Sequence, residues 1–428
     1  MGSVDVPVAL LGYGTVGAAV NRLLTEGADE IERATGHRMR VVRALVRDPG
    51  RERAFPAAEG VLTTDFESIA NDPSIAVVAE VMGGVDETGE HVLRLLRAGK
   101  PVVSANKQLV ARRGDELFDA ASEAGVQLRF EASVCAAIPV IKVLREALVA
   151  TNIHRILGIV NGTTNFMLTQ MEAGSEYDEA LAEAQRLGYA EADPTEDVNG
   201  ADAAAKMAIL ATVAFGSRVR LDDVQYDGIE RIRLEHVRAA HELGMAVRLI
   251  GSATLIGDAV DVRVEPAFVD RDHPLAAVDG PFNAVMLQGD AIREITLEGP
   301  GAGGLATASA VVADMVSIIG TTGTGFLQND ASWRTLERLP PGDLRSPYYL
   351  SIEVDDRPGV LAHVALRLAA DDVSVARLSQ RQLNGSASLD IVTHEASAGS
   401  VRAAAAALAH LPEVHGEPDV IRVVAERG

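Results

Sequence analysis

The stretch from Val6 to Gly17 reads VPVALLGYGTVG and decides the fold of the N-terminal part of the chain. A short apolar run leads into a GxGxxG loop, and a helical pattern follows from Ala18 to about Thr35. In this context the glycines permit a tight turn, and the helix N-terminus offers N–H donors to a pyrophosphate. We therefore predict a dinucleotide-binding loop made of Gly12, Tyr13, Gly14, Thr15, Val16 and Gly17. A strand–turn–helix unit without a ligand is the alternative.

Strands and helices continue to alternate downstream of this loop. We expect strands at 40–46, 77–82, 101–104 and 126–130, and helices at 90–98 and 114–124. This alternation is typical of a doubly wound α/β sheet with parallel strands, which is the Rossmann-like arrangement. Such sheets bind ligands at the carboxyl ends of their strands. Gly83 and Gly84, after the third strand, and Ser104, in the fourth, are therefore expected on the cofactor side.

The residues after the second strand bear on the choice of cofactor. An acid at this position binds the ribose hydroxyls of NAD, whereas an arginine can bind the 2′-phosphate of NADP. Here the sequence is Val46-Arg47-Asp48. Arg47 favours NADP over NAD, and a solvated loop arginine is an equal alternative for this residue.

Two further regions follow the N-terminal sheet. From about residue 150 the pattern mixes helices with a strand-rich part, and a long apolar helix covers about 300–320. Three prolines and a glycine between Glu337 and Pro347 indicate a linker. Beyond it the elements follow in the order βαββαβ, which is ferredoxin-like. The expected divisions are 1–140, 141–336, the linker 337–347, and 348–428.

Composition excludes several classes of function. The net charge of −22 and the pI near 4.9 argue against nucleic-acid binding and against anionic membrane surfaces. No apolar run is long enough to span a membrane, and no basic segment marks a signal peptide. The single cysteine, Cys135, fits a reducing compartment, so we expect a cytoplasmic protein.

Lysine is scarce, because only four of the 39 basic residues are lysines. Lys107 lies three residues after the end of the fourth predicted strand. Lys206 follows Asp202 by four residues in a predicted helix, so both side chains lie on one face. The apolar residues after Lys206 indicate that this helix is largely buried, and a buried lysine needs partners. A surface lysine and a surface ion pair are the alternatives.

The chemistry of lysine suggests a function for these two positions. Lysine can release and take up a proton, whereas arginine cannot. A hydride transfer at an alcohol or aldehyde needs such an acid/base at the oxygen. We therefore predict that Lys206 is the acid/base. Spare carboxylates such as Glu191 and Asp197 suit a substrate that carries an ammonium group.

The run from Ala184 to Lys206, AQRLGYAEADPTEDVNGADAAAK, resembles the motif of homoserine dehydrogenases. The resemblance extends from Val6 to the end of the chain. It includes four shorter stretches, namely SANK at 104–107, EASV at 131–134, NGTTN at 161–165 and GPGAG at 299–303.

The resemblance implies NAD(P)-dependent interconversion of L-homoserine and L-aspartate 4-semialdehyde, in the biosynthesis of threonine, methionine and isoleucine. By motif position, Lys206 is the acid/base at the substrate oxygen, and Lys107 assists at that oxygen and near the nicotinamide. Asp202 is expected to take part in catalysis with these two lysines. Gly303 belongs to the cofactor site. The implied substrate-binding residues are Gly188, Glu191, Asp197, Asp202 and Thr163.

Three further features are implied by the resemblance. Glu131 and the carbonyls of Val134, Ala136 and Ile138 resemble a loop that binds a sodium ion, although Cys135 and Ala136 stand where glycines are common. Residues from 348 onward resemble an ACT domain, in which L-threonine is the expected effector. A homodimer through the middle domain is also expected.

The ACT domain resemblance is looser at one turn, because Asp371-Asp372-Val373 stands where a glycine turn is more typical. An alternative function is a non-catalytic amino-acid sensor, in which an ACT domain is attached to a degenerate dehydrogenase. The presence of Lys107, Asp202 and Lys206 argues against this alternative.

Overall fold

The computed structural model describes residues 4–35, 37–320, 336–383 and 385–424. The contacts within the chain divide it into two compact units, each assembled from separate segments. Residues 321–335 of the expected middle region lie outside the described residues. The segments of unit 1 are Met1–Gly162, Asp202–Val224 and Phe282–Leu336, and those of unit 2 are Thr163–Ala201, Gln225–Pro281 and Glu337–Gly428.

Unit 1 contains the parallel sheet that the glycine loop predicts. Its strands are β1 (Val4–Leu11), β2 (His37–Leu45), β3 (Leu62–Thr63), β4 (Val77–Glu80), β5 (Val102–Ser104) and β6 (Leu128–Arg129). The order is β3-β2-β1-β4-β5-β6, and every neighbouring pair is parallel. This is the doubly wound order in which ligands bind beyond the carboxyl ends of the strands. The sequence pattern missed β3, which has only two residues.

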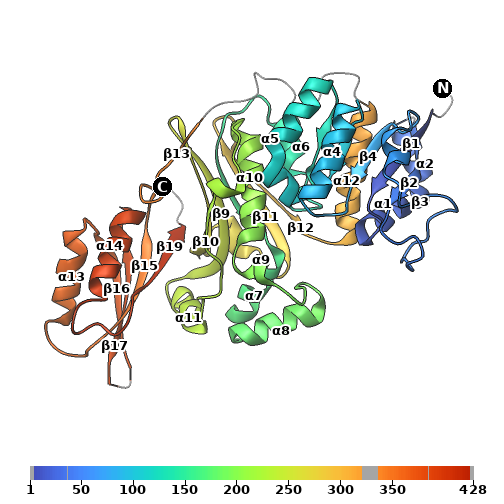
Figure 1. Cartoon of the computed structure of the whole chain (residues 1–428). Helices are drawn as coiled ribbons and strands as arrows, with labels where there is room; N and C mark the ends of the chain where they lie inside the picture. Colours follow the sequence, from blue (N-terminus) through green and yellow to red (C-terminus); the bar gives the residue numbers. More distant parts are fainter. Residues whose placement is uncertain (1–3, 36, 321–335, 384, 425–428) are drawn as a thin grey trace. The chain divides into compact units, whose positions relative to one another are not determined.

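Helices flank this sheet, and one of them comes from a distant part of the chain. They are α1 (Thr15–Glu26), α2 (Ala28–Thr35), α3 (Glu67–Ala70), α4 (Asp86–Arg97), α5 (Lys107–Ala124) and α12 (Gly304–Gly320). Helix α12 lies beside α1 (Figure 1), and Val311 and Met315 share a core with Val8 and Leu10 of β1. The predicted helix from Ala18 to Thr35 is two helices that meet at Gly27.

Helix α5 begins earlier than the pattern suggests. The sequence predicts a start at Gly114, but the helix begins at Lys107. The cause is Asn106, whose side-chain oxygen accepts a hydrogen bond of 3.1 Å from the N–H of Leu109. An asparagine in this position satisfies a donor that the first helical turn leaves without an intrahelical partner. Lys107 is therefore held at a helix N-terminus.

The rest of unit 1 adds a second group of strands and one buried helix. The elements are η1 (Glu131–Ser133), α6 (Val140–Lys142), η2 (Val143–Ala147), β7 (Ile153–Ile159), α10 (Ala201–Phe215), η3 (Leu221–Asp223), β11 (Phe282–Gly289) and β12 (Arg293–Pro300). Strand β11 pairs antiparallel with both β7 and β12. Nearly all of α10 is buried, as expected from its apolar sequence.

Unit 2 combines helices with a long hairpin. Its first elements are α7 (Gly162–Glu172), α8 (Tyr177–Leu187), α9 (Thr195–Val198), β8 (Gln225–Tyr226), α11 (Leu234–Glu242), β9 (Met245–Ile256), β10 (Ala259–Asp270), η4 (Pro274–Ala277) and β13 (Glu337–Arg338). Strands β9 and β10 pair antiparallel over their whole length. No helix in the described ranges is long and apolar enough to cross a membrane.

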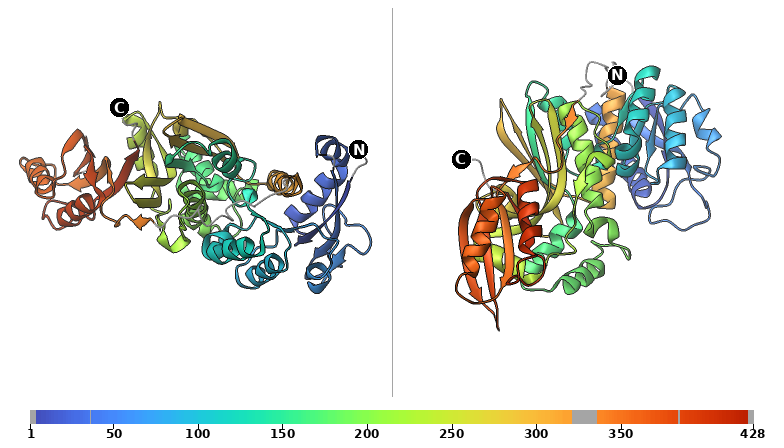
Figure 2. Two further views of the ribbon diagram at one scale, coloured as in Figure 1. Left: turned by 90° about the horizontal axis from the view of Figure 1, so that it is seen from above. Right: turned by 60° about the vertical axis from the view of Figure 1, so that its left-hand side comes forward.

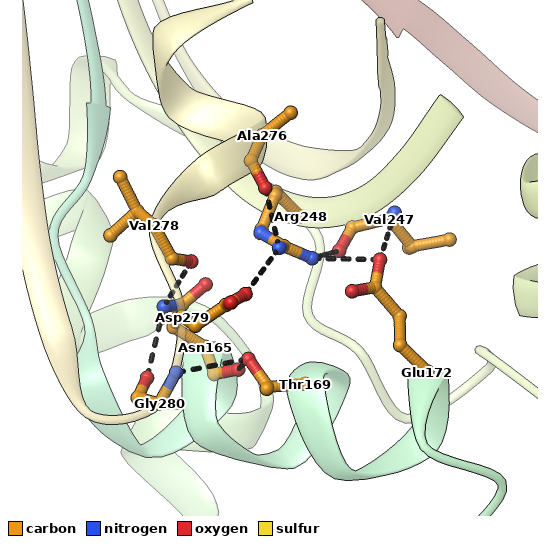
Figure 3. A network of polar contacts seen from close by, with 9 residues as sticks. All are labelled: Asn165, Thr169, Glu172, Val247, Arg248, Ala276, Val278, Asp279 and Gly280. Atoms are coloured by element: carbon orange, nitrogen blue, oxygen red, sulfur yellow. Dashed lines mark hydrogen bonds and ion pairs between the residues drawn. The ribbon is translucent and has the colours of Figure 1, made fainter. Parts of the chain in front are cut away.

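A buried arginine ties three elements of unit 2 together (Figure 3). Arg248 on β9 is 1% exposed and donates to the carboxylate of Glu172 at 2.9 Å and to the carbonyl of Ala276 at 2.8 Å. A further hydrogen bond of 3.1 Å reaches the carboxylate of Asp279. Because a buried guanidinium needs partners for its charge, this network fixes the C-terminal end of α7 against β9 and the 276–279 loop.

The C-terminal part of unit 2 follows the βαββαβ order. Its elements are β14 (Arg345–Ser346), β15 (Tyr348–Val354), α13 (Val360–Ala370), β16 (Val375–Gln382), β17 (Ala387–Thr393), β18 (Ala396–Ser397), α14 (Ala398–Leu408) and β19 (Asp419–Val424). The strand order is β19-β15-β17-β16. Helices α13 and α14 pack on one face of this sheet (Figure 2).

The C-terminal sheet continues into the hairpin through its last strand. Strand β19 pairs antiparallel with β15 on one side and parallel with β10 on the other. Asp419 on β19 also lies 2.9 Å from the Nε2 of the buried His236 on α11. Asp372 adopts the left-handed conformation with φ of 60° after α13, at the turn where glycine is more typical.

Candidate active site

The centre of the candidate site is one carboxylate shared by two lysines. Asp202 and Lys206 lie one helical turn apart on α10, and the Nζ of Lys206 donates to Oδ2 of Asp202 at 2.7 Å. The Nζ of Lys107, at the start of α5, forms an ion pair with Oδ1 of the same carboxylate. The side chain of Asp202 is 3% exposed, that of Lys206 is 12% exposed and that of Lys107 is 34% exposed. The structure thus brings together the three residues that the sequence analysis proposed for catalysis.

Two groups at the end of β7 complete the surroundings of this carboxylate. The side-chain amide of Asn161 donates to Oδ2 of Asp202 at 2.9 Å. The carbonyl of Val160 accepts a hydrogen bond of 2.8 Å from the Nζ of Lys206. Asn161 belongs to the NGTTN stretch, but the sequence analysis gave a role only to Thr163 there. A polar side chain directly after a buried strand was the available signal.

The electrostatics favour an ionised Asp202. Burial alone would raise the pKa of this carboxyl, but the ammonium groups of Lys206 and Lys107 outweigh burial and hold the pKa well below its usual range. The ionised carboxylate therefore keeps both lysine amines aligned. An amine held in this way can exchange a proton with the oxygen of a bound ligand, which is the chemistry of a general acid/base.

A cavity of about 1010 Å³ opens at the glycine loop. The loop residues that line it are Gly12, Tyr13, Gly14 and Thr15. Arg47, Met82 and the first residues of α12 lie on its other walls. Gly303, with φ of 131°, directly precedes α12. The volume is suitable for a nucleotide-sized ligand.

Glycine is suited to Gly17 and to Gly14 for different physical reasons. A Cβ at Gly17 would lie 2.4 Å from the carbonyl oxygen of Gly12, so only glycine allows α1 to pack so closely. By contrast, a Cβ at Gly14 would meet nothing within 4 Å. The space beside Gly14 is where a pyrophosphate could approach the backbone. Val16 packs against the core of unit 1.

Hydrogen bonds from Arg53 connect the loop after β2 to the glycine loop. The guanidinium of Arg53 donates to the carbonyl of Tyr13 at 3.2 Å and to the carbonyl of Asp48 at 2.7 Å. Arg47 and Arg51 also line the cavity. Within the described residues, no ion pair or hydrogen bond occupies the side chains of Arg47 or Arg51. The acidic residues Asp48 and Glu52 line the same cavity.

The other predicted cofactor residues lie at the carboxyl ends of β4 and β5. Gly83 and Gly84 follow β4 with φ of 74° and 81°. Ser104 ends β5 and is fully buried, and its hydroxyl donates to Glu80 at 2.6 Å. Glu80, which is the last residue of β4, was not predicted as a site residue.

Two buried carboxyl groups lie close together, namely Glu131 of η1 and Asp314 of α12. The backbone N–H of Glu131 donates to Asp314 at 2.8 Å, and its carboxylate accepts from the N–H groups of Ile141 and Lys142, each at 2.8 Å. Burial and the neighbouring Asp314 raise the pKa of Glu131 to about 7. Burial raises the pKa of Asp314 to about 6. The two buried acids thus disfavour each other's ionisation.

The turn after Glu131 has an unusual backbone. Cys135 and Ala136 have φ of 53° and 38°, in the left-handed region that side chains disfavour. Glycine would adopt this backbone without the strain that a side chain adds. The N–H of Ile138 donates to the carbonyl of Cys135 at 2.9 Å and closes the turn. Burial raises the pKa of the Cys135 thiol to about 11, so the thiol stays neutral.

Apart from Asp202 of unit 1, the residues predicted to bind the substrate lie in unit 2. Gly188 ends α8 with φ of 79°, and the hydroxyl of Thr163 donates to the carbonyl of Tyr189 at 2.7 Å. This bond fixes the start of α7 to the turn after α8. Glu191 is exposed, and Asp197 is half-buried in α9.

Comparison with known proteins shows which family the chain resembles. A family model described as homoserine dehydrogenase matches residues 139–316, and one described as the NAD-binding domain of homoserine dehydrogenase matches residues 12–131. The homoserine dehydrogenase of Corynebacterium glutamicum is 40% identical over 425 residues, which cover 98% of this chain and 95% of the relative. That of Bacillus subtilis is 40% identical over 403 residues, with 92% of each chain covered.

Solved structures of homoserine dehydrogenases also superpose on this chain. The crystal structure of a homoserine dehydrogenase from Thiobacillus denitrificans superposes with a TM-score of 0.94 at 39% identity, and 99% of each chain is covered. A hyperthermophilic archaeal homoserine dehydrogenase in complex with NADPH superposes with a TM-score of 0.62 at 28% identity, over 75% of this chain and 100% of the other.

Proposed function

The chain belongs to the homoserine dehydrogenase family of oxidoreductases, and we propose that it interconverts L-homoserine and L-aspartate 4-semialdehyde. The observation that carries this reaction is the carboxylate of Asp202, which holds the amines of Lys107 and Lys206 at one place. The reaction moves one hydride and one proton, and a lysine amine is suited to the proton.

The residues of the chain then have the following roles. In the oxidation direction the neutral amine of Lys206 takes the proton of the substrate hydroxyl and becomes an ammonium, and in the reduction direction the ammonium gives that proton to the substrate oxygen. Lys107 lies on the other oxygen of Asp202 and stabilises the charge that develops on the substrate oxygen. Asn161 and the carbonyl of Val160 hold the carboxylate and the Lys206 amine in place. The bound nicotinamide supplies the hydride acceptor or donor.

NADP is the proposed cofactor, with NAD as the alternative. Support comes from Arg47 and Arg51, two arginines on the cavity wall whose charges suit the 2′-phosphate. Arg53 holds the loop that carries them. The archaeal relative solved with NADPH is consistent with this preference.

The amino-acid end of the substrate is proposed to bind in unit 2. Glu191 and Asp197 would attract the ammonium group, and Gly188 leaves the backbone free to approach a ligand. Thr163 would act by fixing the turn after Gly188, because its hydroxyl already donates to Tyr189. These roles rest on the position of each residue in the family motif.

A monovalent cation, sodium, is proposed at the segment from Glu131 to Ile138. The carboxylate of Glu131 and the carbonyls of Val134, Ala136 and Ile138 would hold it. Support comes from the raised pKa of Glu131 and from the left-handed turn at Ala136. A cation there would stiffen the turn and would take no part in the proton transfer.

The region 348–428 is proposed to be an ACT domain that binds L-threonine as a feedback effector. Its βαββαβ order and its sheet, continuous with β10 through β19, support a regulatory connection to the hairpin.

The proposed divisions remain 1–140 for the cofactor, 141–336 for the substrate and a homodimer contact, and 337–347 as a connection. That connection contains the short strands β13 and β14.

The test is a steady-state assay of nicotinamide reduction with L-homoserine, run with NADP and with NAD, and repeated with L-threonine and with sodium or potassium salts. We expect homoserine-dependent turnover that is faster with NADP, is stimulated by sodium and falls as threonine is added. Turnover without threonine sensitivity would remove the ACT proposal alone. Binding of an amino acid without any turnover would instead support the sensor.

A further inference from the structure

Glu80 is a fully buried carboxylate that the proposed reaction does not use. It is the last residue of β4 and is 0% exposed. Within the described residues it forms no ion pair with a lysine, arginine or histidine. Burial raises the pKa of this carboxyl, although hydrogen bonds from Ser104 and the backbone oppose the effect. An acid placed in such a costly environment needs a structural or functional reason.

Both oxygens of Glu80 accept hydrogen bonds, and the donors come from two different loops. Oε1 accepts from the N–H groups of Met82 at 2.9 Å and Gly83 at 3.1 Å, in the turn that follows β4. Oε2 accepts from the hydroxyl of Ser104 at 2.6 Å, at the end of β5. Met82 lines the large cavity, so one carboxylate joins a wall of that cavity to the neighbouring strand.

The network continues from Ser104 to the start of α5. The Oγ of Ser104 accepts a hydrogen bond of 3.1 Å from the N–H of Asn106. Asn106 caps α5 through Leu109 and donates to the carbonyl of Gly84 at 2.6 Å. The next residue is Lys107. Its backbone position is therefore set by a chain of hydrogen bonds that begins at Glu80.

We propose that Glu80 is a positioning residue, whose carboxylate fixes the separation between the cavity wall at Met82 and the amine of Lys107. This inference rests on the proposed function, in which Lys107 acts at the substrate oxygen next to the nicotinamide. A carboxylate suits the role because its two oxygens accept from the N–H groups of Met82 and Gly83 and from the hydroxyl of Ser104 at the same time. A small displacement of a catalytic group can lower a rate by about 100-fold.

The test compares two substitutions at this position. Glu80→Gln keeps the shape and one acceptor oxygen for the two backbone N–H groups, and its amide can donate to Ser104. Glu80→Ala removes every bond. We expect kcat to fall by about 100-fold in Glu80→Ala and by less than about tenfold in Glu80→Gln, with little change in the KM for homoserine. Asp261→Asn is the control, since it alters a buried carboxylate paired with Arg263 in unit 2 and should leave kcat unchanged.

A double-mutant cycle separates positioning from a general loss of structure. If Glu80 acts through Lys107, then Glu80→Ala should lower kcat much less in a Lys107→Met background than in the wild type. Equal effects in the two backgrounds would overturn the proposal. Unchanged kcat in a folded Glu80→Ala variant would also overturn it.

A second readout does not depend on activity. Hydrogen exchange of the backbone amides around Asn106 and Leu109 should be faster in Glu80→Ala than in the wild type and in Asp261→Asn. Equal exchange rates would contradict the positioning role even if kcat fell. If the wild-type protein lacked homoserine turnover, the proposed function would fail, and the exchange data would still decide whether Glu80 fixes the start of α5. If Glu80→Ala did not fold, Ser104→Ala would break the same connection and should give the same kinetic and exchange changes.

Discussion

Lys206 lies one helical turn after Asp202 on α10 and donates a 2.7 Å hydrogen bond to its carboxylate. The other oxygen of that carboxylate pairs with Lys107, which begins a different helix. Two helices that are distant in sequence are thus joined at one buried acid. Nearly all other basic residues of the chain are arginines. This arrangement accounts for lysine at both positions, because lysine, unlike arginine, combines an ion pair with proton exchange.

Removal of Lys107 should impair the reaction without abolishing it. We expect Lys107→Met to lower kcat by about 10- to 100-fold, because the substrate oxygen loses a cation while Lys206 remains. Lys107→Arg should recover part of the loss, since it keeps the ion pair with Asp202. Steady-state rates with saturating cofactor measure both effects. A Lys107→Met variant with wild-type kcat would exclude a role at the substrate oxygen.

Asp202 should make the stability of the protein depend on pH in one direction. Its pKa is lower in the folded chain than in the unfolded one, so the carboxylate stabilises the fold above the unfolded pKa of about 3.9, and this contribution is lost as the pH falls further. Thermal unfolding of the wild type and of Asp202→Asn between pH 7 and pH 3 measures this contribution. We expect the wild type to be more stable at pH 7 and the difference to shrink below about pH 4. A constant difference would contradict the ionised state of Asp202.

The two arginines on the cavity wall should set the cofactor preference. We expect Arg47→Ala and Arg51→Ala each to raise the KM for NADP by about tenfold and to leave the KM for NAD nearly unchanged, because NAD lacks the 2′-phosphate. Arg22→Ala is the matched control, since Arg22 lines the same cavity but pairs with Glu26. Equal effects on both cofactors would show that the arginines act on the shared part of the dinucleotide.

Arg248 should contribute strongly to the stability of unit 2. Arg248→Met leaves the partly buried carboxylate of Glu172 without its cation, and loss of one partner of a buried pair costs about 3–5 kcal/mol. Urea unfolding measures the change in free energy. Arg186→Met removes an exposed arginine paired with Glu183 and should change stability by less than about 1 kcal/mol. Similar values for the two variants would argue against the importance of the network in Figure 3.

The parts of the fold that depend on local sequence could be predicted from it. The apolar run up to Leu11 and the glycine loop predicted β1, the turn and α1, because each depends on nearby residues. The pair of Asp202 and Lys206 followed from helical spacing alone. The break at Gly27 and the early start of α5 were missed, because a glycine cap and an asparagine cap override the apolar pattern.

Contacts between distant segments could not be predicted in the same way. The pairing of Lys107 with Asp202 depends on how α5 packs near α10, and no spacing rule encodes that. Asn161 and Glu80 were missed for the same reason, since their roles come from hydrogen bonds to residues brought close by the fold. The resemblance to a known family supplied site roles that residue patterns alone left open.

The most direct test of the central claim compares the wild type with Lys206→Ala and Lys206→Arg in homoserine-dependent reduction of NADP, with NADP binding measured on the same samples. The account predicts rapid turnover in the wild type and a loss of about 100- to 10,000-fold in both variants, with NADP binding retained, because neither side chain can exchange the proton. Wild-type turnover in Lys206→Arg would show that a fixed positive charge is sufficient, and would contradict the assignment of Lys206 as the acid/base.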